Sequence, residues 1–290
     1  DLLAEADLAM YRAKERGRGR VEVFEEGLRA RAADRMSTEA ALRRAIEGGE
    51  LEVFYQPVIA LRSGAVQGAE ALVRWRDPER GLVPPGLFVP TAEETGLIIP
   101  MTAFVLSRAL QDFAALDGLT VAVNISARQL VDRRFPDDVA ALIAASGIDP
   151  ARVTLEITET AVLADPEASL AVLHRLREQG LTLALDDFGT GYSALAHLQQ
   201  LPVGCVKIDR SFVDGITASP TDRALVQAVA GLASALNLRL VAEGVESEAQ
   251  AAVLRTMDCP SAQGYLYAKP MPYDEFLAFV ADDRRQRRVA

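Results

Sequence analysis

Histidine and cysteine are scarce in this sequence, with two of each among 290 residues. The histidines, His174 and His197, fall inside predicted helices, so a histidine-based metal site is not expected. The cysteines, Cys205 and Cys259, fall in different predicted strands, which favours a reduced pair over a disulfide framework. Zinc is disfavoured as well, because it prefers histidine and cysteine ligands.

The sequence also lacks an excess of positive charge and a long uninterrupted apolar run. Its net charge of −10 argues against a nucleic-acid duplex or an anionic membrane as partner. The longest apolar stretch, near residues 224–238, contains Gln227, Ser234 and Asn237 and is predicted to be a buried helix rather than a membrane span. No signal peptide is recognisable. We expect a cytoplasmic location, and a membrane anchor in a longer parent protein stays open.

The first residues predict the end of a preceding domain. The chain opens at Asp1 without a methionine, which indicates a piece of a longer protein. Residues 1–16 have the periodicity of an amphipathic helix and residues 21–24 resemble a strand, and these two elements alone cannot bury a core. We assign residues 1–26 to that preceding domain and the Arg-rich residues 27–37 to a linker or connecting helix. Ser37 is predicted to cap a helix over residues 38–48.

From residue 51 onward, strands alternate with helices. Residues 51–61 and 66–75 are predicted to form an antiparallel hairpin across a short turn. Further strands are predicted near 119–125, 152–157, 181–186, 204–208, 238–242 and 260–264. Helices are predicted near 86–95, 100–117, 135–146, 166–179, 192–199, 220–236, 247–257 and 273–281, and the basic tail over 283–290 is expected to fray. The alternation predicts an α/β fold of the TIM-like βα barrel type.

Each of seven apolar strand-like runs ends in a polar residue. Working residues of βα barrels lie at the C-terminal ends of the strands, so these side chains are expected to meet in one site. The alternative, for any one of them, is a helix cap or a surface group. The seven runs end in Glu70, Asn124, Glu156, Asp186-Asp187, Lys207, Glu243 and Gln263.

Carboxylate and amide oxygens suit Mg²⁺ or Mn²⁺. This many carboxylates could not all stay ionised in one place without cations, and two ions would clamp the attacking and leaving oxygens of a phosphoryl transfer. Because adjacent strand residues point to opposite faces, Asp186 and Asp187 can share the site only if the strand ends between them. The following Phe188-Gly189-Thr190-Gly191 is predicted to supply that break.

Lys207 ends a strand inside this predicted site. Burial and neighbouring metal ions would disfavour its charged form, so it is a candidate general base or a group that orients metal-bound hydroxide. The alternative is a salt bridge to Asp209 or to the carboxylates. Residues 186–193 contain two glycines and suit a mobile lid, with an ordinary βα loop as the alternative.

The motifs of this chain resemble the EAL domain, named for a Glu-Ala-Leu signature. The resemblance covers about residues 38–282, and residues 6–14 resemble the C-terminal helix of a GGDEF (diguanylate cyclase) domain. It is carried by Tyr55-Gln56-Pro57, Glu70-Ala71-Leu72-Val73-Arg74-Trp75, Asn124-Ile125-Ser126, Glu156-Ile157-Thr158-Glu159, Asp186-Asp187-Phe188-Gly189-Thr190-Gly191, Lys207-Ile208-Asp209, Ala242-Glu243-Gly244-Val245-Glu246 and Gln263-Gly264-Tyr265.

The resemblance implies a (β/α)8 barrel with one antiparallel strand and hydrolysis of cyclic di-GMP to linear pGpG with Mg²⁺ or Mn²⁺. It implies that Lys207 activates the water, with Glu70 and Glu243 also catalytic. One ion would be held by Glu70, Asn124, Glu156 and Asp186, and the second by Asp186, Asp187 and Glu243.

The same resemblance implies roles around these residues. Arg74 and the Leu72 backbone would contact phosphate, with Gln56, Asp209 and Gln263 near the substrate and metals. Glu159 would hold the loop that contains Gly189, Thr190 and Gly191, close to a homodimer interface, and Asp209 and Glu246 would support the metal ligands.

Two other functions remain open. A receptor would bind cyclic di-GMP without cleaving it, although it would need neither two ions nor Lys207. A different metal-dependent barrel hydrolase would act on another phosphodiester. The full set of polar strand ends favours the phosphodiesterase.

Overall fold

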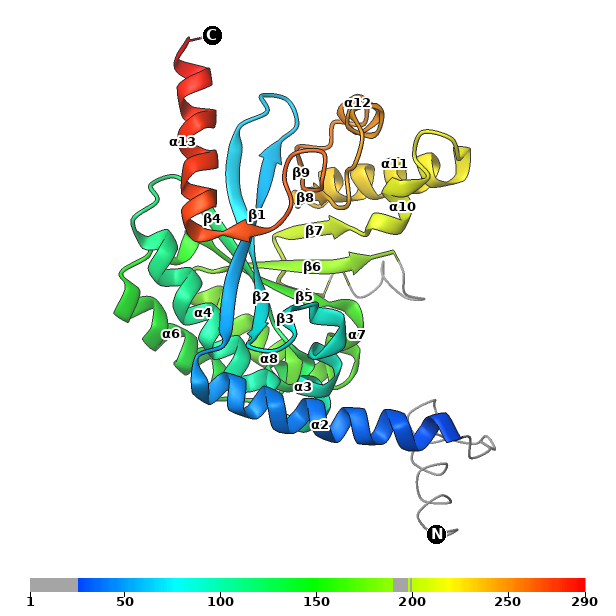
Figure 1. Cartoon of the computed structure of the whole chain (residues 1–290). Coiled ribbons are helices and arrows are strands. Elements are labelled where there is room, and N and C mark those ends of the chain that lie inside the picture. Colours follow the sequence, from blue (N-terminus) through cyan, green and yellow to red (C-terminus); the bar gives the residue numbers. More distant parts are fainter. Residues whose placement is uncertain (1–25, 190–197, 199, 290) are drawn as a thin grey trace. The chain divides into compact units, whose positions relative to one another are not determined.

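The computed structural model describes residues 26–189, 198 and 200–289 (Figure 1). They divide into two compact units, which we treat separately. Residues 26–51 and 75–98 form the smaller unit, and the described residues of 52–74 and 99–289 form the barrel unit. The helix and strand predicted over residues 1–24, and most of the helix predicted near 192–199, lie outside the described residues.

The smaller unit contains α2 (Glu26–Gly48), β3 (Gly81–Val83), the 3₁₀-helix η1 (Pro85–Leu87) and α3 (Val89–Thr95). Its core is built around Trp75, which is fully buried. The Trp75 ring meets Phe88 edge-on at 5.8 Å, and its Nε1–H donates to Glu50 Oε2 at 3.0 Å. Arg80 lies over the same ring, 4.7 Å from its centroid.

Residues 27–37, predicted to be a linker or connecting helix, are helical and continue without a break into the helix predicted over 38–48, so the predicted cap at Ser37 is wrong. α2 runs without a break from Glu26 to Gly48. Residues 28–37 contain no proline or glycine, and the Ala, Arg, Leu and Met residues that dominate them are good helix formers. Arg-rich composition alone did not distinguish a linker from the first turns of a helix.

A closed barrel of eight strands makes up the centre of the barrel unit. Its strand order is β1-β9-β8-β7-β6-β5-β4-β2, and β1 and β2 pair to close it. The strands are β1 (Leu51–Ala60), β2 (Val66–Asp77), β4 (Thr120–Asn124), β5 (Val153–Thr158), β6 (Thr182–Phe188), β7 (Cys205–Ile208), β8 (Arg239–Ala242) and β9 (Ser261–Ala262). All neighbours from β2 through β4 to β9 are parallel, whereas β1 is antiparallel to β9. The predicted barrel with one reversed strand is confirmed.

Helices follow most of the parallel strands, as predicted. In the barrel unit they are α4 (Ile98–Ala114), α5 (Ala127–Leu130), α6 (Phe135–Ser146), η2 (Pro150–Arg152), α7 (Glu159–Leu163), α8 (Pro166–Glu178), α10 (Arg210–Asp214), α11 (Pro220–Ala235), α12 (Glu248–Thr256) and α13 (Tyr273–Val289). The longer ones match their predictions within a few residues, except α13, which continues well past its predicted end at residue 281. The short α5, α7 and α10 and the two-residue strand β10 (Met271–Pro272) were missed, because so few residues give no periodicity.

The sequence explains why these elements form where they do. Residues of β5 and β7 are nearly all buried, as expected for parallel strands that are covered on both faces. Polar side chains begin the helices: Asp165 accepts from Ala168 N, Ser219 accepts from Asp222 N, and Ser247 forms a capping box with Gln250. The buried apolar strands and the capped helix starts thus fix where the elements of the barrel begin and end.

The basic C-terminal segment is helical, so the predicted fraying is wrong. α13 continues to Val289 beside the β1–β2 turn (Figure 1), where Arg287 Nη1 donates to Ser63 O at 2.7 Å. Asp283 accepts from Val66 N at 3.3 Å, and Arg284 Nη2 donates to Asp117 O at 2.9 Å. These contacts stabilise the last turns of α13, which a run of like-charged arginines would not stabilise by itself.

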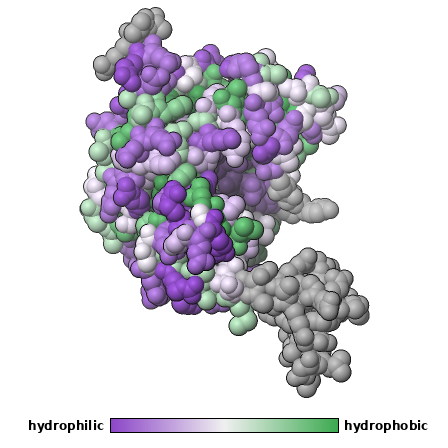
Figure 2. All heavy atoms as spheres, viewed as in Figure 1, coloured by the Kyte–Doolittle hydropathy of each residue, from purple (hydrophilic) through white to green (hydrophobic). Residues whose placement is uncertain are grey.

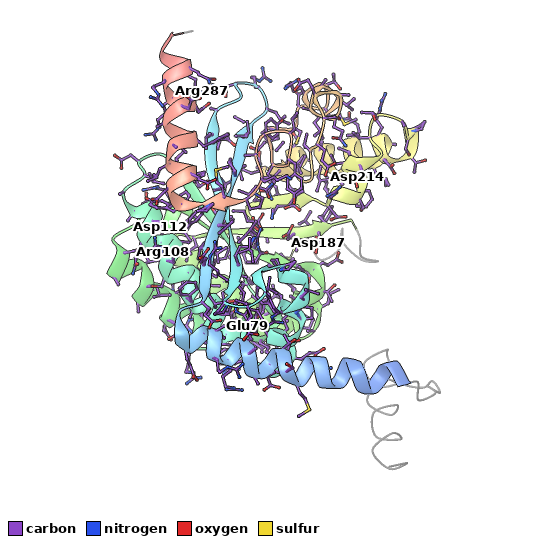
Figure 3. All side chains as sticks on the ribbon, viewed as in Figure 1. Glu79, Arg108, Asp112, Asp187, Asp214 and Arg287 are labelled. Carbon is purple, nitrogen blue, oxygen red and sulfur yellow. The ribbon has the colours of Figure 1, made fainter. Side chains whose placement is uncertain are left out.

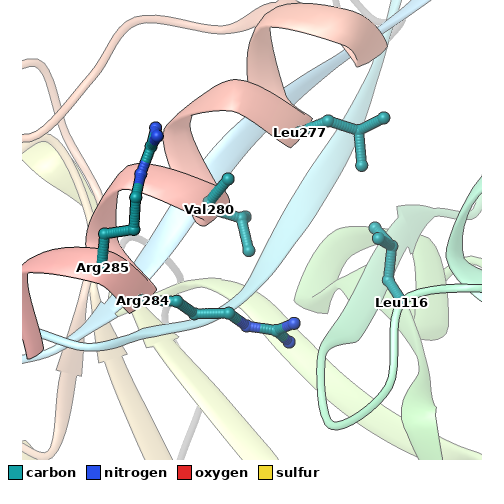
Figure 4. Close-up of a pocket in the computed structure, with 6 residues that line it drawn as sticks. Leu116, Leu277, Val280, Arg284 and Arg285 are labelled. Carbon is teal, nitrogen blue, oxygen red and sulfur yellow. The ribbon is translucent and has the colours of Figure 1, made fainter. Parts of the chain in front are cut away.

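A cavity of about 330 Å³ lies beside α13 (Figure 4). It is lined by Leu116, Leu277, Val280, Ala281, Arg284 and Arg285.

Hydrophilic residues cover most of the visible face, where hydrophobic residues form scattered patches (Figure 2). α11, predicted to be a buried helix, buries only Val226, Ala230 and Ala233 fully. Within the part of the chain that the structure describes, no helix has both the length and the apolar composition needed to cross a bilayer. The consecutive helices Val89–Thr95 and Ile98–Ala114 reach these values only when taken as a pair.

Both cysteine thiols are expected to resist alkylation in the folded protein. Burial raises the pKa of Cys205 to about 11 and that of Cys259 to about 12, so almost no reactive thiolate exists at pH 8. Mass spectrometry after iodoacetamide treatment should find neither thiol modified in buffer and both modified in concentrated urea. Rapid labelling of either cysteine in the folded protein would show that its end of the barrel opens readily.

Candidate active site

Polar side chains that lie on, or directly follow, seven strands converge inside the mouth of the barrel. The parallel ladders place Asn124 opposite Glu156, Thr158 opposite Asp186, and Lys207 opposite Val241. Glu243 directly follows β8, and its N–H donates to Ile208 O at 3.1 Å. In-register parallel pairing therefore brings residues far apart in the sequence to one level of the barrel.

Lys207 lies at the centre of this cluster and is 2% exposed. Its Nζ is 2.5 Å from Glu243 Oε1, 2.7 Å from Glu156 Oε2, 3.2 Å from Asp186 Oδ2 and 3.4 Å from Glu70 Oε2. The salt bridge to the carboxylates, one of the alternatives for this lysine, is therefore present. We call Lys207 with these four carboxylates the lysine–carboxylate cluster.

Burial and charge act in opposite directions on Lys207. Burial lowers the pKa of its ammonium group, but Glu156, Glu70, Glu243 and Asp186 together raise it well above its ordinary value. Four carboxylates outweigh the loss of hydration, so Lys207 carries its proton in this arrangement. The prediction that Lys207 loses its charge is wrong for this arrangement. Burial does lower its pKa, as expected, but the prediction did not include the larger opposite effect of the surrounding carboxylates.

The carboxylates of the cluster differ from one another in acidity. Burial raises the pKa of Glu70. The charge of Lys207 and the hydrogen bonds from Gln263 and Asn124 lower this pKa by more than burial raises it, so the net shift is downward. Burial raises the pKa of Glu243 to about 7 and that of Glu156 well above its ordinary value, despite Lys207. One lysine cannot neutralise four carboxylates, so the cluster retains an affinity for protons or other cations.

Two amide side chains orient Glu70. Asn124 Nδ2 donates to Glu70 Oε1 at 2.7 Å, and Gln263 Nε2 donates to Glu70 Oε2 at 2.6 Å. Gln263 Nε2 is also 3.5 Å from Glu243 Oε1, while its own Oε1 is buried without a hydrogen-bond partner among the described residues. A buried amide oxygen without a partner is an acceptor that a ligand or cation can satisfy.

Glu70 ends the apolar run Gly68-Ala69-Glu70 but lies within β2, whose predicted extent, residues 66–75, agrees with the structure to within two residues. β2 runs on to Asp77, and only its stretch from Gly68 to Ala71 pairs with β4. Alternate residues of a strand point to the same face, so Glu70, Leu72 and Arg74 share one face of β2. The strand is longer because its last residues pair with β3.

The strand also does not end between Asp186 and Asp187. β6 continues to Phe188, and a register shift between Leu185 and Phe188 interrupts its pairing with β7. Asp187 has φ of 54°, in the left-handed region, and lies at the end of β6 (Figure 3). A bulge with a left-handed residue thus interrupts the regular alternation that would point these two successive side chains to opposite faces. Burial, Asp186 and Asp209 raise the pKa of Asp187, in that order.

The predicted substrate contacts lie around the cluster. The Arg74 guanidinium is 5.6 Å from the Phe54 ring centroid, and its Nη1 donates to Val73 O at 2.8 Å. Burial lowers the pKa of Arg74, with Tyr265 and Glu70 acting in the opposite direction. Leu72 is half-buried. Phe54 was not singled out in the sequence, although it precedes the Tyr55-Gln56-Pro57 motif directly.

Gln56 is positioned through its neighbour on β1. The Tyr55 hydroxyl donates to the buried Asp112 at 2.6 Å, and Arg108 donates to the same carboxylate at 3.0 Å on α4 (Figure 3). Adjacent strand residues point to opposite faces, so anchoring Tyr55 to α4 turns Gln56 the other way. Gln56 Nε2 donates to Ala268 O at 3.3 Å.

Asp209 and Glu246 make contacts outside the cluster. Asp209 caps α10 by accepting from Ser211 N at 3.1 Å and Ser211 Oγ at 2.5 Å. Glu246 pairs with Arg210 at 2.8 Å. The structure therefore shows a helix cap and a surface ion pair at these positions, and the roles predicted for them near substrate and metals stay predictions.

Glu159 begins α7 and is buried, with neither carboxylate oxygen partnered among the described residues. Its predicted contact with the loop after β6 involves Thr190 and Gly191, which lie outside the described residues. Gly189, the last described residue before them, has φ of 102° and packs near Phe212.

The donor set fits divalent cations by its chemistry. All candidate ligands offer oxygen atoms, and the buried Gln263 Oε1 has no hydrogen-bond partner in the part of the chain that the structure describes. Within the described ranges, no three His, Cys, Asp or Glu side chains are already arranged around a common metal position. Lys207 Nζ forms ion pairs with these carboxylates and occupies the space between them.

Comparison with known proteins places this site in a described family. A model of the EAL domain matches residues 39–270. The bifunctional diguanylate cyclase/cyclic di-GMP phosphodiesterase MucR of Pseudomonas aeruginosa is 40% identical over 286 residues, 97% of this chain and 42% of that protein. The cyclic di-GMP phosphodiesterase PdeR of Escherichia coli is 40% identical over 275 residues, 93% of this chain and 42% of that protein. This chain thus spans about two fifths of the length of these relatives.

A solved structure supports the same grouping. A structure described as the PaMucR phosphodiesterase in complex with c-di-GMP has a TM-score of 0.79 and 38% identity, over 83% of this chain and 99% of that chain.

Removing Lys207 is expected to destabilise the protein strongly in metal-free buffer. Lys207→Ala would leave three buried carboxylates and the half-buried Glu243 without their cation, and breaking a buried ion pair from one side costs about 3–5 kcal/mol. Urea unfolding in the presence of EDTA measures this loss. Lys269→Ala removes an exposed lysine and should change the free energy of unfolding by less than about 0.5 kcal/mol. Equal stability of the two variants would show that protons, not Lys207, neutralise the cluster.

Proposed function

Because this chain belongs to the EAL domain family, we propose that it hydrolyses one phosphodiester bond of cyclic di-GMP and releases linear pGpG. The observation that carries this proposal is the buried lysine–carboxylate cluster at the strand ends, with Glu243 and Glu156 within 2.7 Å of Lys207. The printed activities of MucR and PdeR support the substrate. A binding surface alone would not require five ionisable groups in a buried position.

Divalent cations, Mg²⁺ or Mn²⁺, are part of the proposal. Glu70, Asn124, Glu156 and Asp186 would hold one, and Asp186, Asp187 and Glu243 a second. When bound, two such ions supply Lewis-acid stabilisation of the attacking and leaving oxygens. The excess of carboxylates over lysine supports this, as does the positive φ of Asp187, which lets two successive aspartates approach one region.

Lys207 would position the attacking water and take part in its deprotonation. Surrounded by four carboxylates, its Nζ holds a proton and cannot accept another. It becomes a candidate base only where part of the carboxylate charge is neutralised, because the same carboxylates are what raise its pKa. Glu70 and Glu243, whose carboxylates lie 3.4 Å and 2.5 Å from Nζ, would keep this group in place.

Arg74 and the backbone of Leu72 would bind the substrate phosphate, with Gln56, Asp209 and Gln263 nearby. A guanidinium can pair with phosphate oxygens through two parallel hydrogen bonds. Its place over Phe54 supports this role, because the ring restricts the side chain before substrate arrives. Glu70 and Arg74 lie on one face of β2, so a phosphate at Arg74 would be close to the cluster.

The wider regulatory roles are also proposed. The buried carboxylate of Glu159, which has no partner within residues 26–189, 198 and 200–289, would accept hydrogen bonds from the loop that holds Gly189, Thr190 and Gly191. We further propose that the protein forms a homodimer through the barrel near this loop, and that Glu246 and Asp209 support the metal ligands. Residues 1–26 would be the end of a GGDEF domain, which the bifunctional description of MucR supports.

Metal-dependent formation of pGpG is the expected result of incubating the protein with cyclic di-GMP and Mg²⁺ or Mn²⁺. Chromatography should show product with metal and none with EDTA. Glu70→Gln should lower turnover at least about 100-fold, because it removes the charge of a central ligand while keeping its size. Glu178→Gln, which changes an exposed glutamate on α8, is the matched control and should retain full activity. Binding of cyclic di-GMP without product under every metal condition would instead identify a receptor.

A further inference from the structure

Phe54 lies at the rim of the barrel, near the beginning of the one reversed strand. β1 pairs with β9 in the antiparallel direction, with Ile59 opposite Ala262. The residues of β1 that precede Ile59 therefore lie beyond the end of β9, on the side of Gln263 and the lysine–carboxylate cluster. A search for functional residues at the C-terminal ends of strands misses this position, because the reversed strand reaches the rim with its N-terminal end.

The Phe54 ring lies under the side chain of Arg74. The guanidinium carbon of Arg74 is 5.6 Å from the centroid of the ring. Phe54 is 8% exposed, and burial lowers the pKa of Arg74, so water is partly excluded from this contact. A cation within about 6 Å of an aromatic face is attracted by the ring, and the attraction is stronger where water is excluded.

A ring differs from a carboxylate as a partner for an arginine that has to bind phosphate. A carboxylate would occupy the N–H donors of Arg74, and these bonds would have to break before a phosphate could bind. The ring occupies none of the donors, and the bond from Nη1 to Val73 O uses one of five. The contact with Phe54 can therefore persist while the guanidinium donates to phosphate oxygens.

The backbone of Phe54 is held from two sides. β10 pairs with β1 so that Pro272 lies opposite Phe54. The next residue, Tyr55, donates its hydroxyl to Asp112 Oδ2 at 2.6 Å, and the Tyr273 hydroxyl donates to Asp112 O at 2.8 Å. β1, α4 and the start of α13 are thus joined at Asp112. The ring of Phe54 is a fixed surface that does not follow the arginine when the arginine moves.

We infer that Phe54 is a positioning residue, which holds the Arg74 guanidinium in the orientation that receives the substrate phosphate. The inference rests on the proposed function, in which Arg74 binds phosphate. Two alternatives give Phe54 a role without Arg74: its ring only fills space in the barrel mouth, or it contacts a base of the substrate directly. Positioning differs from both, because its effect must vanish when Arg74 is absent.

Phe54→Leu keeps a buried apolar side chain and removes the aromatic face. It is expected to raise KM for cyclic di-GMP about 5- to 30-fold, the range that corresponds to a largely desolvated contact between a cation and a ring. The turnover number kcat should stay within about twofold, because bound substrate and transition state share the phosphate contact. Phe54→Tyr keeps the ring and should restore KM to within about twofold of the unaltered protein. Phe104→Leu makes the same change at a half-buried position on α4 and should leave KM unchanged.

A double-mutant cycle separates positioning from packing and from direct contact with the substrate. Arg74→Gln removes the charge that the ring holds, so adding Phe54→Leu to Arg74→Gln should change KM by less than about twofold. If Phe54→Leu raises KM as much in the Arg74→Gln protein as in the unaltered one, the ring acts without the arginine and the inference is overturned. An unchanged KM in Phe54→Leu alone, or a loss confined to kcat, would overturn it as well.

Calorimetric titration with cyclic di-GMP keeps this inference separable from the proposed function. If the unaltered protein binds the dinucleotide but does not cleave it, the phosphodiesterase proposal fails. The dissociation constants of the unaltered protein, the two single variants and the double variant then test the role of Phe54, with the same expected ratios. Cleavage by the unaltered protein together with an additive cycle would overturn the role of Phe54 alone. Absence of both binding and cleavage would overturn both.

Discussion

The site depends on a single buried ammonium group. Lys207 Nζ is within 3.4 Å of four carboxylates that come from four different strands. Without a cation among them, carboxylates this close and this deeply buried would repel one another and lose hydration. Lys207 makes the convergence of these strand ends electrostatically tolerable. It leaves an excess of negative charge, which is the property a divalent-cation site requires.

The barrel supplies the precision that such a cluster needs. Parallel ladders hold neighbouring strand ends in register, and the amides of Asn124 and Gln263 fix Glu70 on both of its oxygens. On β1, the hydrogen bond from the Tyr55 hydroxyl to Asp112 fixes the strand, and its neighbour Gln56 points to the opposite face. Charged groups in the mouth are thus positioned by neutral hydrogen-bonding groups and by helices behind the strands.

Much of this arrangement could be predicted from the sequence. Apolar runs ending in Glu156, Asp186, Lys207 and Glu243 identified both the parallel strands and the side chains that meet, because strand ends in a barrel share one rim. The bulge at Asp187 could not be predicted, since a register shift depends on the neighbouring strand. The pKa direction of Lys207 depends on four distances, and these exist only in three dimensions. The extension of α13 depends on contacts with Ser63 and Asp117, which are distant in the sequence.

The left-handed backbone at Asp187 also bears on how this fold can change over evolutionary time. Asparagine and glycine adopt such a conformation readily, whereas β-branched residues do so at a real cost. Both asparagine and glycine are one nucleotide change away from aspartate, and neither carries its negative charge. The conformation therefore directs drift at this position toward replacements that preserve the barrel while removing a proposed metal ligand. A descendant of this chain could therefore lose the proposed metal ligand in one step and keep the barrel.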